Sequence, residues 1–291
     1  MQIKDFEWVH LDDPTPATLD AIGEQYDLPQ RFLTAALDEF EEPRIDQLDA
    51  PVALMNVRVP HAFESETGVA TYETVPLTLL FCDQALVTVA KLGQVDLTQV
   101  QAQLAAASNA KTASFVIVAW ALAAYDQVIA DLSQRVQTME GRVAEASQNR
   151  LLYEVMALEK ALVHLTSALA AMHTMLKQAS RSEFGQAHAI TMHELTVQAH
   201  QALSVAQKTE EILDQYNTAI SSVIGNNLNL IMKFLTGVSI ILAIPPIFSG
   251  IWGQNTWIPW RQPVYGFWVV LGLTLLVSLA TAWWLKKKKY M

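Results

Sequence analysis

The chain has 291 residues, of which 52% are hydrophobic, and a formal net charge of −10. The length allows two domains, and the acidic balance argues against nucleic-acid binding and suits cationic partners. The one cysteine, Cys82, excludes an intrachain disulfide framework, and the acidic N-terminal segment lacks the apolar run of a signal peptide.

Residues 1–92 are predicted to form a cytoplasmic α/β domain. Seven of the eleven prolines lie in residues 1–76, and such breakers end strands and turns. Residues 12–15, Asp-Asp-Pro-Thr, are typical of a helix start before an amphipathic stretch. Residues 53–59 and 75–90 are rich in Val, Leu and Thr and predict strands.

The following part of the chain is predicted to be helical throughout, with a helical hairpin over residues 93–185 and a stalk helix over 186–233. Apolar residues recur at alternating spacings of three and four in residues 122–143, 151–176 and 195–223. This period of 3.5 residues indicates helices packed along narrow seams. Without a strong breaker before the apolar segment that follows, the third helix is expected to continue from about residue 186 to 252.

Two uncharged segments near the C-terminus predict membrane-spanning helices, residues 234–252 and 264–285. A helix of 19 residues is about 28 Å long, the depth of a bilayer core. The polar gap between them, residues 253–263, is expected to be an external loop. A third apolar patch, residues 115–124, is too short for a span and predicts a buried helix in a soluble domain.

Charge predicts the orientation of these spans. All 29 acidic residues lie at or before Asp214, whereas the basic residues after it include Lys233 and the tail at residues 286–291. Positive residues favour the cytoplasmic side, so both termini and the acidic domain are expected in the cytoplasm of a multi-pass protein of the cell membrane. Arg261, in the external loop, opposes this orientation, but more basic residues lie on the side predicted to be cytoplasmic.

Several segments together resemble the CorA family of divalent-cation transporters. They are Asn-Leu-Ile-Met-Lys-Phe-Leu-Thr at residues 229–236, Ile-Pro at 244–245, and Ser-Gly-Ile-Trp-Gly-Gln-Asn at 249–255, followed by the basic tail. The family signature is Gly-Met-Asn, so this chain carries a variant with Gln254. Residues 8–15, Trp-Val-His-Leu-Asp-Asp-Pro-Thr, resemble the opening strand and turn of the family.

The resemblance implies an α+β fold of the CorA kind, with an N-terminal α/β domain, a long helical hairpin, a stalk helix and two C-terminal spans. It implies a homopentamer in the bilayer, with a selectivity filter of Gly253, Gln254 and Asn255. Gly253 is expected to allow the backbone to turn at the end of the span, and Asn255 to present a ring of amide oxygens to hydrated Mg²⁺. The residues expected to line the pore are Asn229, Met232, Leu235, Ser239, Ala243 and Pro246.

Most of these pore residues also recur at spacings of three, four and seven, so one helix face can carry them. Mg²⁺ is the expected transported ion and a candidate regulatory ion, and no cofactor is required. A regulatory carboxylate of the family matches Thr218 here, and Asp214, one turn earlier, is its candidate substitute. The segment after the filter, residues 256–261, lacks the acidic residue that many relatives carry.

Two other functions remain open at the level of sequence. The variant signature is compatible with a transporter of Zn²⁺ or another transition metal, and loss of the filter would leave a non-conducting sensor or scaffold. His193-Glu194 could suggest a metalloprotease, but Val197 stands where that motif needs its second histidine. His188 and His200 are expected to be solvated stalk residues. With no nucleophile–base pair or phosphate loop, the sequence predicts no enzyme.

Overall fold

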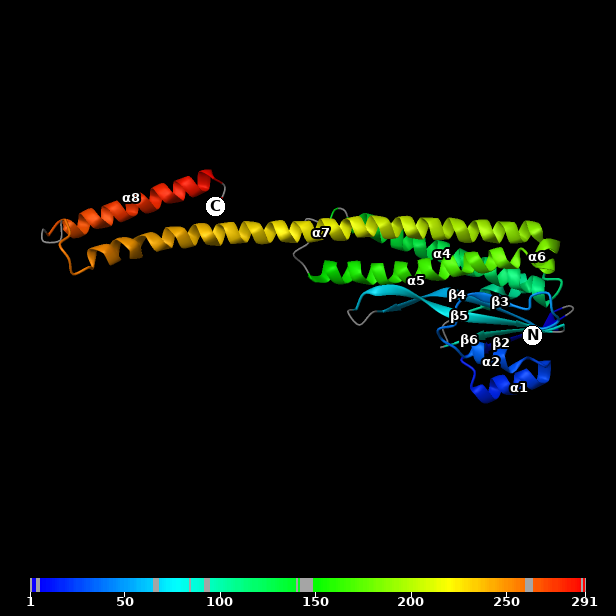
Figure 1. Ribbon diagram of the computed structural model, residues 1–291. Helices are drawn as coiled ribbons and strands as arrows, with labels where there is room; N and C mark the ends of the chain where they lie inside the picture. Colours follow the sequence, from blue (N-terminus) through cyan, green and yellow to red (C-terminus); the bar gives the residue numbers. More distant parts are fainter. Residues whose placement is uncertain are drawn as a thin grey trace. The chain divides into compact units, whose positions relative to one another are not determined.

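The computed structural model describes residues 2–3, 6–64, 68–83, 85–91, 95–139, 141, 149–259, 264–288 and 290. These residues form two compact units, Met1–Asn217 and Thr218–Met291, which divide within one long helix. The predicted α+β class is confirmed, because strands fill the first part of unit 1 and long helices form the remainder (Figure 1). The finer division of the chain into seven predicted segments stays a prediction.

Unit 1 is built on a six-stranded mixed sheet with the order β1-β2-β6-β5-β4-β3. Only β2 and β6 run parallel among these strands, with Trp8 opposite Leu86, and every other neighbouring pair is antiparallel. The β4–β5 hairpin is the longest pairing and extends from the central sheet. The strands are β1 (Gln2–Ile3), β2 (Phe6–Asp12), β3 (Arg44–Asp46), β4 (Ala53–Glu64), β5 (Ala70–Phe81) and β6 (Ala85–Ala90).

The strand predicted over residues 75–90 is wrong as a single element, because the chain reverses within it. The N–H of Cys82 donates to the carbonyl of Ala85 at 3.0 Å and closes a tight turn between β5 and β6. Both flanking strands are buried on both faces. Asp83 and Gln84 interrupt the apolar run at this point, so the sequence does mark the turn, and the prediction of one continuous strand overlooked that signal.

Two short helices cover one face of the sheet. Helix α1 (Pro16–Tyr26) begins at the predicted position, where the Thr15 hydroxyl accepts from the N–H of Thr18 at 3.2 Å. Helix α2 (Gln30–Ala36) follows, and its Phe32 is fully buried. Together they enclose a core whose buried members are Leu19, Leu28, Phe32, Leu33, Ala35, Ala36, Leu54, Leu80, Val87 and Val89.

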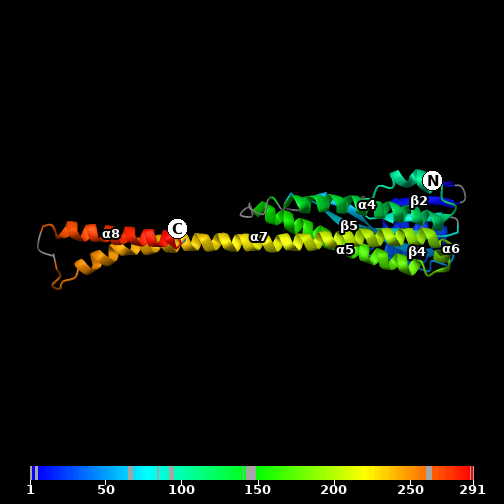
Figure 2. The same ribbon diagram turned by 90° about the horizontal axis from the view of Figure 1, so that it is seen from above.

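Long helices cover the opposite face of the sheet (Figures 1 and 2). A short connection, η1 (Thr98–Val100) and α3 (Gln101–Leu104), leads into α4 (Ala110–Met139), and α5 (Asn149–Ala179) returns antiparallel to it. The described members of the predicted seam from residue 122 to 139, and all of those from 151 to 176, are buried. The period of 3.5 residues therefore predicted the packed faces of both helices.

The third seam lies on α7 (Ala189–Trp252), a continuous helix of 64 residues. Its first part is fastened to α4 by hydrogen bonds from Gln198 to Asp126 at 3.2 Å and between the Ser133 and Thr209 hydroxyls at 2.8 Å. The predicted start near residue 186 is wrong by a few residues. Residues 183–187 form a separate short helix, α6 (Glu183–Ala187), because the chain leaves helical geometry at His188.

Unit 2 consists of the end of α7 and helix α8 (Gly266–Lys287). Four described helices are long and apolar enough to cross a membrane: α4, α5, α7 and α8. The most apolar windows of α4 and α5 are 50% and 44% buried within the chain, whereas those of α7 and α8 are 11% and 6% buried. The apolar windows of α4 and α5 are thus about half covered by protein, whereas those of α7 and α8 are mostly uncovered. The predicted buried helix at residues 115–124 lies within α4.

Candidate functional site

The predicted filter lies where α7 ends. The N–H of Gly253 still donates to the carbonyl of Ser249 at 2.8 Å, and the N–H of Gln254 bonds the Ile251 carbonyl at 3.3 Å, so the last turn tightens. Gly253, Gln254 and Asn255 are exposed at the end of the helix. The Gln254 and Asn255 side chains and the Gly253 backbone can therefore meet solvent, ions or another copy of the chain.

The glycine at position 253 is needed for space rather than for backbone conformation. Its φ does not lie in the left-handed region, in contrast to that of Gly68. A Cβ atom at Gly253 would instead lie 3.0 Å from the Ser249 carbonyl oxygen, closer than ordinary van der Waals contact. The chain does turn at Gly253, directly after α7 ends, and the close approach to Ser249 is a physical reason for glycine there.

One face of α7 in unit 2 is covered by α8. Gly237 and Ile244 are buried on α7, and Gly266, Thr274 and Leu285 are buried on α8, at intervals that keep each set on one helix face. In this part of the chain α8 is the one described neighbour of α7. Figures 1 and 2 show α8 running back beside this end of α7.

The residues predicted to line a pore lie on the other face of α7. At about 100° per residue, all six fall within a sector of roughly 120° whose centre lies about 130° from the direction of Gly237 and Ile244, with Asn229 at the edge nearest to them. All six are exposed; Met232 and Leu235, for example, have 64% and 63% of their surface accessible. A face with two large apolar side chains uncovered in the single chain is a surface available for contact with a further copy or with lipid. The six are Asn229, Met232, Leu235, Ser239, Ala243 and Pro246.

A buried donor without a partner lies beside the filter. Among the described side chains, the indole nitrogen of Trp252 is the one buried nitrogen or oxygen with no hydrogen-bond partner. Its ring stacks on Phe248, with ring centroids 6.3 Å apart. A buried N–H without an acceptor is unfavourable. Water or a neighbouring copy is therefore expected to supply the acceptor at this end of α7.

The candidate regulatory residues do not form a metal site within one chain. Asp214 and Thr218 are both exposed on α7, and the Thr218 carbonyl accepts a hydrogen bond from the Ser222 hydroxyl at 2.9 Å. Within the described ranges, no cluster of three or more His, Cys, Asp or Glu side chains could hold a metal ion. A regulatory ion at Asp214 would therefore need ligands from another copy, and this site stays a prediction.

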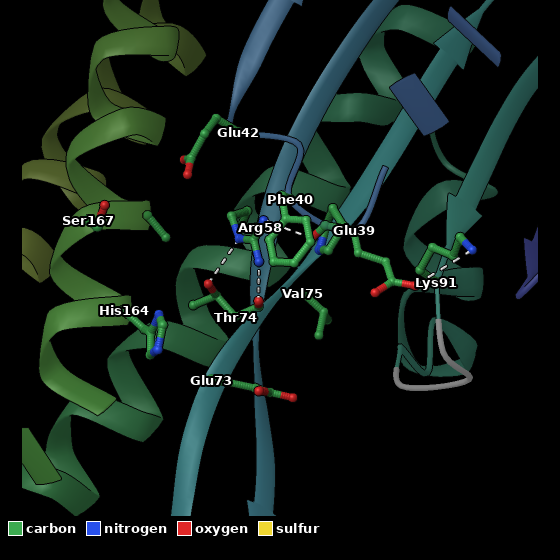
Figure 3. A pocket seen from close by; sticks show the side chains of 12 residues that line it. Glu39, Phe40, Glu42, Arg58, Glu73, Thr74, Val75, Lys91, His164 and Ser167 are labelled. Atoms are coloured by element: carbon green, nitrogen blue, oxygen red, sulfur yellow. Dashed lines mark hydrogen bonds and ion pairs between the residues drawn. The ribbon is translucent and has the colours of Figure 1, made fainter. Parts of the chain in front are cut away.

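Unit 1 contains a cleft that was not predicted from the sequence. It has a volume of about 360 Å³ and lies between α5 and the β4–β5 hairpin (Figure 3). Arg58 in its floor donates to the Thr74 hydroxyl at 3.0 Å and the Glu41 carbonyl at 3.0 Å. This guanidinium holds the loop before β3 onto β4, so it acts as a structural tie. Glu73 and His164 also line the cleft.

Comparison with known proteins identifies the family. The profile of the family described as "CorA-like Mg2+ transporter protein" matches residues 4–287. The chain belongs to this family. Its members are transporters rather than enzymes, in agreement with the sequence-based expectation. Among curated proteins, the chain is similar to the cobalt/magnesium transport protein CorA of Methanocaldococcus jannaschii, with 21% identity over 279 residues, 94% of this chain and 87% of that protein.

Solved structures agree on the fold. The complete CorA magnesium transporter of Methanocaldococcus jannaschii superposes with a TM-score of 0.77 at 19% identity, covering 97% of this chain and 91% of that one. Full-length CmaX gives a TM-score of 0.71 at 18% identity, covering 98% and 88%. The ZntB cytoplasmic domain from Vibrio parahaemolyticus gives 0.59 at 13% identity, covering 77% and 90%. At these identities the similarity establishes the CorA fold for both units.

Proposed function

We propose that this chain forms a homopentameric pore in the cell membrane and conducts divalent cations, Mg²⁺ above all, into the cytoplasm. In this proposal the end of α7 lines the pore and α8 faces the lipid. Gly253, Gln254 and Asn255 form the filter at the outer mouth, and Asn229 forms a second polar ring at the inner end.

The observation that carries the proposal is the division of α7 into two faces. Gly237 and Ile244 are buried, whereas all six residues proposed for the pore are exposed and lie within one sector of roughly 120°. Copies of the chain arranged around a symmetry axis would place that side inward and α8 outward. The bore would then be apolar at Met232 and Leu235, a lining that can close by dewetting, and polar at its two ends.

The chemistry of the filter suits Mg²⁺. This ion gives up its water ligands reluctantly, so a site that selects it can bind the hydrated ion through its waters. Amide and carbonyl oxygens of Gln254 and Asn255 offer such acceptors from every copy. Gln254 replaces the methionine of the family signature and adds a second amide to the ring. This addition is where we expect any difference in ion preference to arise.

Membrane potential is a sufficient driving force for entry. Moving two charges inward yields roughly 4.6 kcal/mol per 100 mV. The uncharged segment from residue 234 to 252 holds no ionisable side chain that could relay protons. Lys233 before this segment and Lys286 and Lys287 at the end of α8 favour a cytoplasmic location for both helix ends, and hence for unit 1.

Ion flux into proteoliposomes tests the proposal. The purified chain would be reconstituted under an imposed potential, and uptake of Mg²⁺, Co²⁺, Ni²⁺ and Zn²⁺ compared. We expect voltage-dependent Mg²⁺ entry that is lost in Asn255→Ala and reduced in Asn229→Ala. Asn226→Ala is the matched control, because Asn226 is exposed three residues earlier and lies outside the sector of the pore residues.

Each other outcome has a definite meaning. Equal Mg²⁺ entry in the native chain and Asn255→Ala would refute the filter. Entry of Zn²⁺ that follows a pH gradient would replace Mg²⁺ influx with transition-metal transport. Absence of flux for every ion, with the oligomer intact, would leave a sensor or scaffold. Gln254→Met, which restores the family signature, then shows whether Gln254 sets the ion preference.

A further inference from the structure

Two histidines from different helices meet on the helical side of unit 1. His173 lies on α5 and His200 on α7, and their ring centroids are 5.1 Å apart with the ring planes tilted by 30°. Each histidine directly follows a buried seam residue, Met172 on α5 and Ala199 on α7. The seam between the helices therefore fixes the two imidazoles at its edge.

The spacing of the two rings matches the spacing required by one metal ion. With metal–nitrogen bonds of about 2.1 Å and a tetrahedral angle between them, two imidazoles on one Zn²⁺ have ring centres roughly 5 Å apart. His200 is exposed and His173 is half-buried, so an ion can reach the pair from solvent. Small rotations of the side chains would bring one nitrogen of each ring onto a shared ion.

We infer that His173 and His200 form a two-histidine site for a transition-metal cation of the Zn²⁺, Co²⁺ or Ni²⁺ class, which clips α7 to α5. Imidazole nitrogen is a good ligand for these ions and a poor one for Mg²⁺, which prefers oxygen. Water completes the coordination sphere. With two protein ligands instead of the four of a structural zinc site, the metal binds reversibly.

The surroundings of His173 favour the uncharged ring that a metal needs. Burial, followed by the Lys177 ammonium and the His200 ring, holds the pKa of His173 below its ordinary value. A lowered pKa favours the neutral imidazole, which is the form that binds a metal. The same Lys177 charge repels a divalent cation. Removing this charge should strengthen metal binding. A Lys177 variant is therefore expected to gain metal affinity, whereas the histidine variants lose it.

The binding experiment uses the full-length protein in detergent and Zn²⁺ alone as the probe, by competition with a chromophoric chelator. His173→Gln and His200→Gln should each weaken binding by at least about tenfold, the lower end of what changes to second-shell groups cause. The double variant should be no weaker than either single one, because the two rings act as one site. Lys177→Gln should bind more tightly than the native chain.

Controls separate this site from diffuse binding by surface histidines. His193 is exposed on α7 one heptad before His200, and His164 lies on α5, so His193→Gln and His164→Gln should leave Zn²⁺ affinity unchanged. His173→Phe keeps an aromatic ring against His200 but removes the nitrogen ligands. A loss of Zn²⁺ affinity in this variant would therefore not be due to a packing defect. Bound Co²⁺ should give the visible absorption of a tetrahedral complex, and excess Mg²⁺ should not displace it.

Three results would overturn the inference. Unchanged affinity in His173→Gln and His200→Gln would show that the rings only stack. Equal losses in the His193 and His164 controls would show diffuse binding, and displacement by Mg²⁺ would show an oxygen site. Since the assay measures binding without flux, its result is independent of whether the chain conducts.

Discussion

The corner between α5 and α7 depends on one glycine, and Gly185→Ala should disrupt it. The N–H of Gly185 donates to the Ser182 hydroxyl at 3.0 Å, which caps α6. An added Cβ would lie 2.1 Å from the Ala179 carbonyl oxygen and 2.9 Å from the Ser180 Cα. Both atoms belong to the backbone, so no side-chain rotation relieves the overlap, and α6 must move away from the end of α5.

The size of the effect follows from that overlap. Overpacking typically costs 1–3 kcal/mol, and a clash with backbone belongs at the upper end, about 3 kcal/mol. For a unit of this size, 1 kcal/mol shifts the unfolding temperature by about 2–4 °C, so we expect a decrease of about 6–12 °C. Thermal unfolding of the full-length protein in detergent, followed by far-ultraviolet circular dichroism, measures it.

Gly272→Ala is the matched control for this substitution. Gly272 lies inside α8, and nothing lies within 4 Å of the position that its Cβ would occupy. Alanine there is favoured over glycine by helix propensity, so the unfolding temperature should stay the same or rise. A Gly185→Ala protein that melts with the native one would refute the close packing of α6 on α5, and with it the stated start of α7.

Three further predictions concern unit 1. Leu165→Ala, at a fully buried position of the α5 seam, should lower the free energy of unfolding by about 2–5 kcal/mol in denaturant titrations. Tyr125→Phe removes the phenol that donates to the Arg58 carbonyl at 3.1 Å, and a loss of about 1–3 kcal/mol is expected by the same titration. Burial, mainly, lowers the pKa of His173, so the unfolded state binds more protons and stability should fall as the pH drops below about 6.5. In His173→Gln this part of the acid sensitivity should disappear from unfolding curves recorded over that range, and an unchanged pH profile would contradict the assignment.

Periodic burial was the most predictable property of this chain. Residues such as Leu158 and Leu165 are buried because a 3.5-residue repeat can bury only one face of a helix, whichever neighbour covers it. The start of α1 was equally local, since Thr15 caps it through its own hydroxyl. Features of this kind depend on residues a few positions apart, so the sequence contains all the information needed.

Features that depend on distant contacts were missed. The break at His188 follows from the packing of Gly185 on the end of α5 rather than from a proline. The pairing of His173 with His200 required knowledge of which helices are neighbours. The proposed filter was predicted in a different way. Its residues were found through the family signature, but its working geometry needs several copies of the chain and is not a property of one.

The two consecutive prolines inside α7, Pro245 and Pro246, create a point at which this helix can bend. Proline has no N–H, so the carbonyls of Ile241 and Leu242 lack the donors four residues later that an unbroken helix would provide. Bending at this point breaks no hydrogen bond that a straight helix would have had, and the spare acceptors can turn to water in an aqueous bore. In the proposed pore, bending at these two prolines in each copy would change the width of the bore.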